Sequence, residues 1–80
     1  MATIKIFGAD WCPMTNRTRE HLQHLGVDYE YIDVEKDPQA SDWVKQQNDG
    51  KEKKPTLLID DEVLRTPSVE ELDEALARAA

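Results

Sequence analysis

The stretch FGADWCPMT, residues 7–15, joins a short apolar strand to an amphipathic helix. Residues 3–7 alternate between apolar and polar side chains, as a half-buried strand does. Gly8 then marks a turn. Pro13 suits the first turn of a helix, because its missing N–H would have no partner there. We therefore predict that Cys12 lies where the strand has ended and the helix begins.

The rest of the chain predicts two helices, one further strand and a hairpin. Gly26 ends the first helix near Leu25, and Asp37 caps a second helix that begins at Pro38. Ser68 and Glu71 form a capping box before the last helix. The first strand, helix and second strand imply a right-handed parallel crossover, whereas the hairpin is antiparallel. The further strands are expected at residues 29–34, 56–59 and 62–65.

These elements predict an α/β fold of order βαβαββα, with a four-stranded mixed sheet and helices on both faces. Each helix carries an apolar stripe that should face the sheet. The side chains expected to point inward are Thr18, Leu22 and Leu25; Ala40, Trp43 and Val44; and Val69, Leu72, Leu76 and Ala79.

The size and charge of the chain limit the kinds of protein that it can be and the partners that it can bind. Eighty residues with 39% hydrophobic and 34% charged side chains predict one globular domain over residues 1–80. A net charge of −7 argues against nucleic acid and anionic membranes as partners. No apolar run is long enough to cross a bilayer, and the start MATIKIF lacks the features of a secretory signal. We expect a cytoplasmic monomer.

Cys12 is the only cysteine, so any disulfide chemistry must involve a second molecule. At a helix N-terminus its sulfur can approach the unpaired N–H groups of Met14 and Thr15. Such surroundings lower the pKa of a thiol and raise its reactive fraction at neutral pH. The alternative is a buried cysteine that acts as a small apolar side chain. His21 and His24 share a helix face, but without a third ligand we predict no metal site.

The string Trp11-Cys12-Pro13-Met14-Thr15 resembles the Cys-Pro-x-Cys motif of glutaredoxins, with Thr15 in place of the second cysteine. Residues 7–12 look more like the corresponding stretch of thioredoxin. Lys54-Pro55-Thr56 is similar to the segment that holds the cis-proline of this superfamily. The resemblance covers essentially the whole chain and implies a thioredoxin fold with Cys12 and Thr15 at the catalytic position. It implies substrate contacts at Trp11, Pro13, Met14, Lys54, Pro55, Pro67 and Ser68.

The resemblance also implies a monothiol reaction. Without a second cysteine, a mixed disulfide at Cys12 must be released by another thiol. The expected substrates are mixed disulfides of proteins or of small thiols. Glutathione or another low-molecular-weight thiol is the expected co-substrate, and no covalently bound cofactor is expected. The Thr15 hydroxyl either donates a hydrogen bond to the Cys12 thiolate or bonds only within the first turn.

Besides Thr15, the chain departs from the glutaredoxin pattern at two further places. Ala9 stands where the family usually has a lysine that attracts glutathione. Pro67-Ser68-Val69-Glu70-Glu71 replaces a Gly-Gly-x-Asp-Asp stretch that holds a glutathione carboxylate. The N–H groups at Ser68 can still receive a carboxylate. Lys51, Lys53 and Lys54 either supply the lost positive charge or form a solvated loop.

Three classes of function follow from these features. The first is a thiol-disulfide oxidoreductase that acts through Cys12. The second is an iron–sulfur cluster carrier, because one-cysteine relatives share a cluster between two subunits with glutathione as extra ligand. Those relatives resemble Cys-Gly-Phe-Ser, and Pro13 in place of that glycine argues for a stiffer site. The third is a binding module without turnover that keeps the groove for a protein partner.

Overall fold

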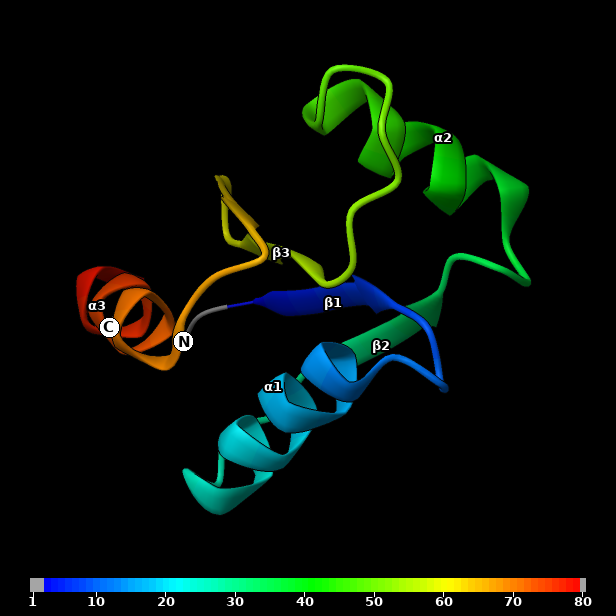
Figure 1. Cartoon of the computed structure of the whole chain (residues 1–80). Helices are drawn as coiled ribbons and strands as arrows, with labels where there is room; N and C mark the ends of the chain where they lie inside the picture. The colour runs from blue at the N-terminus through cyan, green and yellow to red at the C-terminus, as the bar shows by residue number, and fades with distance from the viewer. Residues whose placement is uncertain (1–2, 80) are drawn as a thin grey trace.

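The computed structural model describes residues 3–79, and its elements follow the predicted order βαβαββα (Figure 1). The strands are β1 (Ile4–Gly8), β2 (Glu30–Asp33), β3 (Thr56–Ile59) and β4 (Glu62–Arg65). The helices are α1 (Pro13–His24), α2 (Pro38–Gln47) and α3 (Val69–Ala79).

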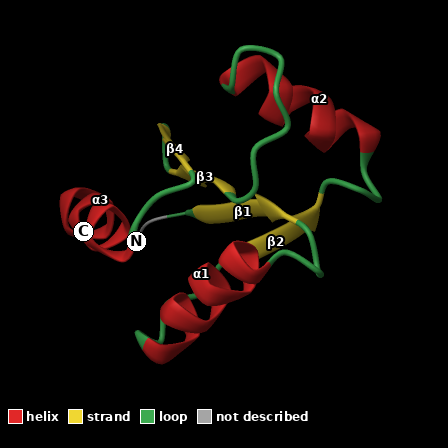
Figure 2. Ribbon diagram, viewed as in Figure 1, coloured by secondary structure: helices red, strands yellow, loops and turns green. Residues whose placement is uncertain are grey.

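The four strands form one mixed sheet in the order β2-β1-β3-β4 (Figure 2). β1 pairs in parallel with β2 and antiparallel with β3, and β3 pairs antiparallel with β4. Ile6 lies opposite Tyr31 on one side and Leu57 on the other. The predicted thioredoxin-like fold is therefore confirmed, with β1 at the centre and its carboxyl end leading directly to Cys12.

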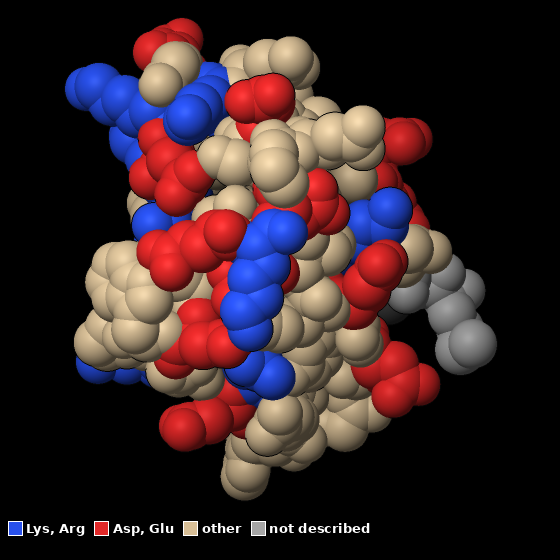
Figure 3. All heavy atoms as spheres, turned by 90° about the vertical axis from the view of Figure 1, so that its right-hand side faces the viewer, with Lys and Arg blue, Asp and Glu red and all other residues tan. Residues whose placement is uncertain are grey.

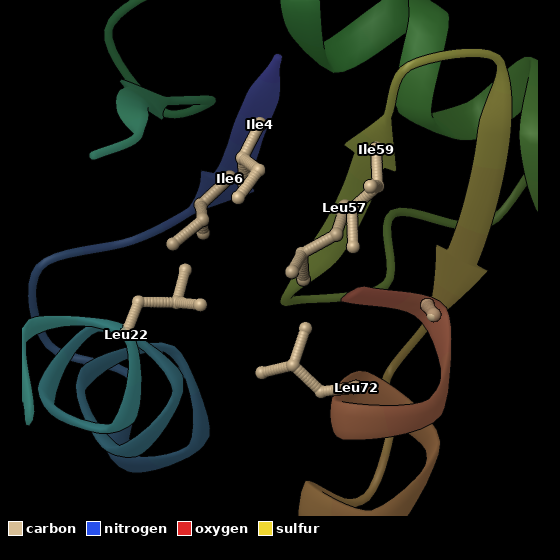
Figure 4. Close-up of a cluster of buried hydrophobic side chains, with 7 residues drawn as sticks. Ile4, Ile6, Leu22, Leu57, Ile59 and Leu72 are labelled. Carbon is tan, nitrogen blue, oxygen red and sulfur yellow. The ribbon is translucent and has the colours of Figure 1, made fainter. Parts of the chain in front are cut away.

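Helices cover both faces of the sheet, as predicted (Figures 1 and 2). On one face, Leu22 of α1 and Leu72 of α3 pack against side chains of β1 and β3 (Figure 4). On the other face, Ala40 and Val44 of α2 pack against Phe7 and other residues of the sheet. This second core also contains Trp43, whose ring lies 4.5 Å from that of Phe7. Full burial of such side chains supplies about 1.5–3 kcal/mol each.

Two side chains predicted to face inward are exposed instead. Leu25 is 46% exposed, because α1 ends at His24 and Leu25 is its cap residue. Val69 is 40% exposed, because it begins α3 at the rim of a surface groove. Ala75 is 1% exposed and contributes to the core from α3, although the predicted stripe left it out.

The predicted helix ends are present in the structure. Gly26 has φ +72°, the left-handed conformation that follows a helix. Asp37 accepts a hydrogen bond from the Ala40 N–H at 3.1 Å. Ser68 and Glu71 bond reciprocally at 3.0 and 3.1 Å as a capping box. Among the helices of residues 3–79, none combines the length and the apolar character needed to cross a membrane.

The end of β1 and the first turn of α1 approach each other very closely. A Cβ at Gly8 would lie 2.5 Å from both Cγ2 and Oγ1 of Thr15. The Thr15 hydroxyl also accepts the Ala9 N–H at 3.4 Å, and the Thr15 side chain is fully buried. Gly8 therefore lacks a side chain because Thr15 fills the space in which one would stand.

We expect Gly8→Ala to destabilise the protein by about 1–3 kcal/mol, because the added methyl group would overlap Thr15. Urea unfolding measures this loss as a lower midpoint at unchanged slope. Thr15→Ala removes both overlapping atoms, so Gly8→Ala should cost clearly less in that background. Equal costs in the two backgrounds would contradict this contact.

Candidate active site

Cys12 occupies the N-cap position of α1, as the sequence predicts. Its backbone is extended, with φ −81° and ψ 117°, and its carbonyl accepts the Asn16 N–H at 3.0 Å. Its own N–H bonds to the Ala9 carbonyl at 3.1 Å, which closes the turn after β1. The residue is 8% exposed, so the sulfur lies in a shielded position at the end of the sheet.

The surroundings of Cys12 lower the pKa of its thiol. Burial acts in the opposite direction, because it disfavours the charged form, but the Thr15 hydroxyl and the N–H groups of Thr15 and Met14 favour the thiolate and outweigh it. The Lys54 ammonium adds a smaller electrostatic contribution. The hydrogen bond that the structure gives the Thr15 hydroxyl is the one it accepts from the Ala9 N–H, so a bond from this hydroxyl to the Cys12 sulfur stays a prediction.

Lys54 and Pro55 stand opposite Cys12. The peptide bond between them is cis, and the Lys54 carbonyl lies 3.9 Å from the Cys12 sulfur. The Pro55 ring is fully buried, and its carbonyl accepts the Thr66 N–H at 2.9 Å. Pro55 is therefore held inside the protein, and the Lys54 carbonyl is the part of this segment that faces the sulfur.

Four side chains form a connected group on one side of Cys12, which we call the Trp11 cluster: Trp11, Glu35, Glu52 and Lys54. Trp11 is 63% exposed, and its indole N–H donates to Glu35 at 2.6 Å. The Lys54 ammonium lies 3.6 Å from Glu35, 3.0 Å from Glu52 and 4.9 Å from the centre of the Trp11 ring. Glu52 also accepts the Ser41 hydroxyl. The Lys54 side chain thus orients Trp11 and is already paired with two carboxylates.

A groove lies on the other side, between the N-terminal turns of α1 and α3. It encloses about 440 Å³. Met14, Pro67 and Ser68, which the resemblance placed near substrate, line it together with Arg17 and Glu70. Pro13 is exposed next to Cys12 but is not part of the lining. Cys12 is not part of the lining either, and Met14, two residues after it, is the lining residue nearest to it along the chain. The predicted residues thus fall into two groups, one in the Trp11 cluster and one in this groove.

The groove differs from the expected anion site at the start of α3. The Glu71 carboxylate accepts the Ser68 N–H, and the Ser68 hydroxyl accepts the Glu71 N–H. The capping box therefore already occupies two of the donors that a substrate carboxylate would need. Ala9 is fully buried, so its position offers no surface for a cation in this chain.

Sequence reasoning missed Glu35, Glu52 and Arg17. The position of Glu35 could have been predicted. The carboxyl ends of the parallel strands β1 and β2 meet at one edge of the sheet, so the residues that follow β2 lie close to those that follow β1. Arg17 lies one turn after Pro13 on α1. The position of Glu52 depends on the path of the loop after α2, and the sequence of this loop carries no periodic signal.

Comparison with known proteins identifies the family. The glutaredoxin family model matches residues 4–64, more than half of the chain. The chain belongs to the glutaredoxin family. This membership supports a thiol-disulfide oxidoreductase of the glutaredoxin type.

Individual relatives agree with this glutaredoxin assignment. Mycoredoxin 1 of Corynebacterium glutamicum is 38% identical over 61 residues, which cover 76% of this chain and 75% of the relative. A thioredoxin-like protein crystallised in a mutant form has a TM-score of 0.84 and 32% identity, covering 96% of this chain and 97% of its own. The glutaredoxin from Archaeoglobus fulgidus has a TM-score of 0.76 and 26% identity, covering 95% and 87%.

We expect Thr15→Ala to raise the pKa of Cys12 and to slow its alkylation by iodoacetamide at neutral pH. A hydrogen bond to a charged group contributes about 1.5 kcal/mol, so a loss of roughly tenfold in rate is expected. Because the pKa is lowered in the native protein, its rate should reach half of its maximum at lower pH than that of the variant.

Thr15→Ser is the matched control, because it keeps the hydroxyl and should retain a rate close to that of the native protein. At a pH above every pKa, where the thiolate is fully formed, Thr15→Ala should react at least as fast as the native protein, because a thiolate of higher pKa is the stronger nucleophile. A rate of Thr15→Ala that stays below the native rate there would show that Thr15 acts on access to the sulfur instead of on its pKa.

Proposed function

We propose that this glutaredoxin-family protein reduces mixed disulfides by a monothiol reaction at Cys12, with a low-molecular-weight thiol as reductant. The observation that carries the proposal is the position of the sulfur at the α1 N-cap. There the Thr15 hydroxyl and two N–H groups favour the thiolate. Thr15 occupies the place of a second cysteine, so no internal thiol is present to complete the exchange.

The reaction balances as two thiol-disulfide exchanges. In the first, the Cys12 thiolate attacks the small-thiol sulfur of a mixed disulfide. A new sulfur–sulfur bond forms to Cys12 as the bond of the mixed disulfide breaks, and the protein sulfur leaves as a thiolate that takes a proton from water. In the second, the thiolate of another small-thiol molecule attacks this adduct, forms the small-thiol disulfide and releases the Cys12 thiolate.

The two sides of the site have different roles in this proposal. The Lys54 backbone lies next to the sulfur and offers polar groups to an extended substrate segment. Trp11 and Met14, both well exposed, offer apolar contact beside it. The groove at Arg17, Pro67 and Ser68 then accommodates the small thiol. Glutathione and other small thiols remain alternatives as the physiological reductant.

The test is to mix the reduced protein with a glutathionylated peptide and to follow both species by mass spectrometry. We expect an adduct of one glutathione on Cys12, which excess glutathione then clears with repeated release of peptide. Cys12→Ser should form no adduct. Absence of an adduct on the native protein would contradict the proposal and favour a binding module without turnover.

Thr15→Cys is the informative companion variant, because it restores a second thiol at the first turn of α1. We expect the adduct on this variant to be short-lived and to be replaced by an internal disulfide between residues 12 and 15. The mass of the variant then falls by the mass of the released small thiol, although no reductant has been added. Persistence of the adduct would show that the residue at position 15 is not placed to resolve it.

A further inference from the structure

The charges beside Cys12 show an unequal pattern in which one cation faces two carboxylates. In the Trp11 cluster, Lys54 pairs with both Glu35 and Glu52. The Lys54 side chain is only 16% exposed, whereas those of Glu35 and Glu52 are 44% and 25% exposed. The positive charge is therefore covered, and the more exposed charge on this side of Cys12 is negative.

A second ion-paired group has the same ratio of charges but a different exposure. Lys36 lies 3.7 Å from Asp10 and 3.9 Å from Asp33. Asp10 also accepts the Tyr31 hydroxyl at 2.7 Å. The Lys36 side chain is 77% exposed, against 60% for Asp10 and 13% for Asp33, so this group, unlike the Trp11 cluster, presents its cation to solvent.

The groove on the opposite side of Cys12 has the same imbalance. Arg17 is its cation, and it forms no ion pair with any carboxylate of residues 3–79. Glu70 and Glu71 are exposed at the start of α3, and the capping box holds Glu71 there. The remaining basic group of the lining, His21, lies 2.7 Å from Asp73, which is 51% exposed.

Apolar surface lies between these charged groups. Trp11, Met14 and Val69 are 63%, 46% and 40% exposed, and Met14 and Val69 border the groove. Figure 3 shows the molecule from the side that was at the right in Figure 1. Acidic and basic side chains alternate there around uncharged surface. The net charge of −7 extends the negative field beyond the site.

We propose that the preferred substrate is a polypeptide cysteine in mixed disulfide with a small thiol and flanked by Lys or Arg on both sides. The flanking cations would face Glu35 and Glu52 on one side of Cys12 and Glu70 and Glu71 on the other. Apolar residues next to the cysteine would cover Trp11 and Met14. This inference rests on the proposed function and adds to it the charge class of the protein substrate.

The same charges disfavour a polypeptide segment that carries carboxylates near its cysteine. Such a segment would meet the exposed carboxylates of Glu35, Glu70 and Glu71, and Lys54 is already paired with Glu35 and Glu52. The exposed cations that it would meet are Arg17 in the groove and Lys36, so the preference rests on the excess of carboxylates over these two. Electrostatic steering at protein surfaces changes association rates by about 10- to 1000-fold and weakens with salt. The Debye length falls from about 30 Å at 0.01 M to about 8 Å at 0.15 M ionic strength, so the preference should shrink over this range.

The experiment uses three glutathionylated peptides that differ only in the residues on each side of the cysteine: Lys, Ser or Glu. The rate of peptide release in a single turnover measures attack by Cys12 without the later reductant step. At low ionic strength we expect the Lys peptide to react at least about tenfold faster than the Glu peptide, with the Ser peptide between them. Equal rates for the three peptides would overturn the inference but leave the proposed function intact. Failure of the Ser peptide to react at all would overturn both.

Charge-neutralising variants locate the preference. Glu35→Gln keeps an acceptor for the Trp11 N–H, and Glu70→Gln removes a carboxylate outside the capping box. Each should lower the ratio of the Lys-peptide rate to the Glu-peptide rate, and the double variant should lower it further. This ratio cancels any change in the intrinsic reactivity of Cys12.

Asp61→Asn is the matched control, because it removes the same charge at the β3–β4 turn. Ile59, which precedes that turn, pairs with Ile4 at the start of β1, and Cys12 follows the other end of β1. The control should leave the ratio unchanged. An equal fall in the ratio for Asp61→Asn and for Glu35→Gln would overturn the local assignment, because only net charge would then matter.

Discussion

The close contact between Thr15 and Gly8 sets the geometry on which the site depends. It brings the first turn of α1 against the end of β1, so closely that no side chain fits at residue 8. The Ala9 N–H is satisfied by the Thr15 hydroxyl, and the Cys12 N–H by the Ala9 carbonyl. Cys12 then becomes the cap residue of α1. Its sulfur is placed at the helix N-terminus by packing and by hydrogen bonds that belong to the fold itself.

The same threonine links stability to chemistry. Its hydroxyl bonds the turn and lowers the pKa of Cys12, so one side chain both closes the strand–helix junction and favours the thiolate. The Lys54 ammonium contributes less to that pKa, and two carboxylates pair with it. The groups at the N-terminus of α1 therefore lower the pKa of Cys12 more than this cation does, whereas our proposal assigns the surrounding charges to the choice of substrate.

The start of α3 illustrates how helix capping and ligand binding compete for the same backbone donors. A helix N-terminus attracts carboxylates through its unpaired N–H groups. Here a carboxylate of the chain, that of Glu71, already bonds the Ser68 N–H. The groove keeps Arg17 as a cation on the α1 side and places exposed carboxylates on the α3 side. The substrate preference that we propose therefore rests on the balance of charge between α1 and the start of α3.

The amino-acid sequence by itself determined the order of the elements, the helix caps, the place of Cys12 at the start of α1, and the glutaredoxin resemblance that implied Pro55 opposite it. Local patterns decide these features, because strand alternation, capping residues and proline act within a few positions. Only the tertiary structure decided that Leu25 and Val69 are exposed, and that Lys54 is paired with Glu35 and Glu52. Lys54 and Glu35 are 19 positions apart in the chain, and the contact between Lys54 and Glu52 depends on an irregular loop, whose path no periodic signal encodes.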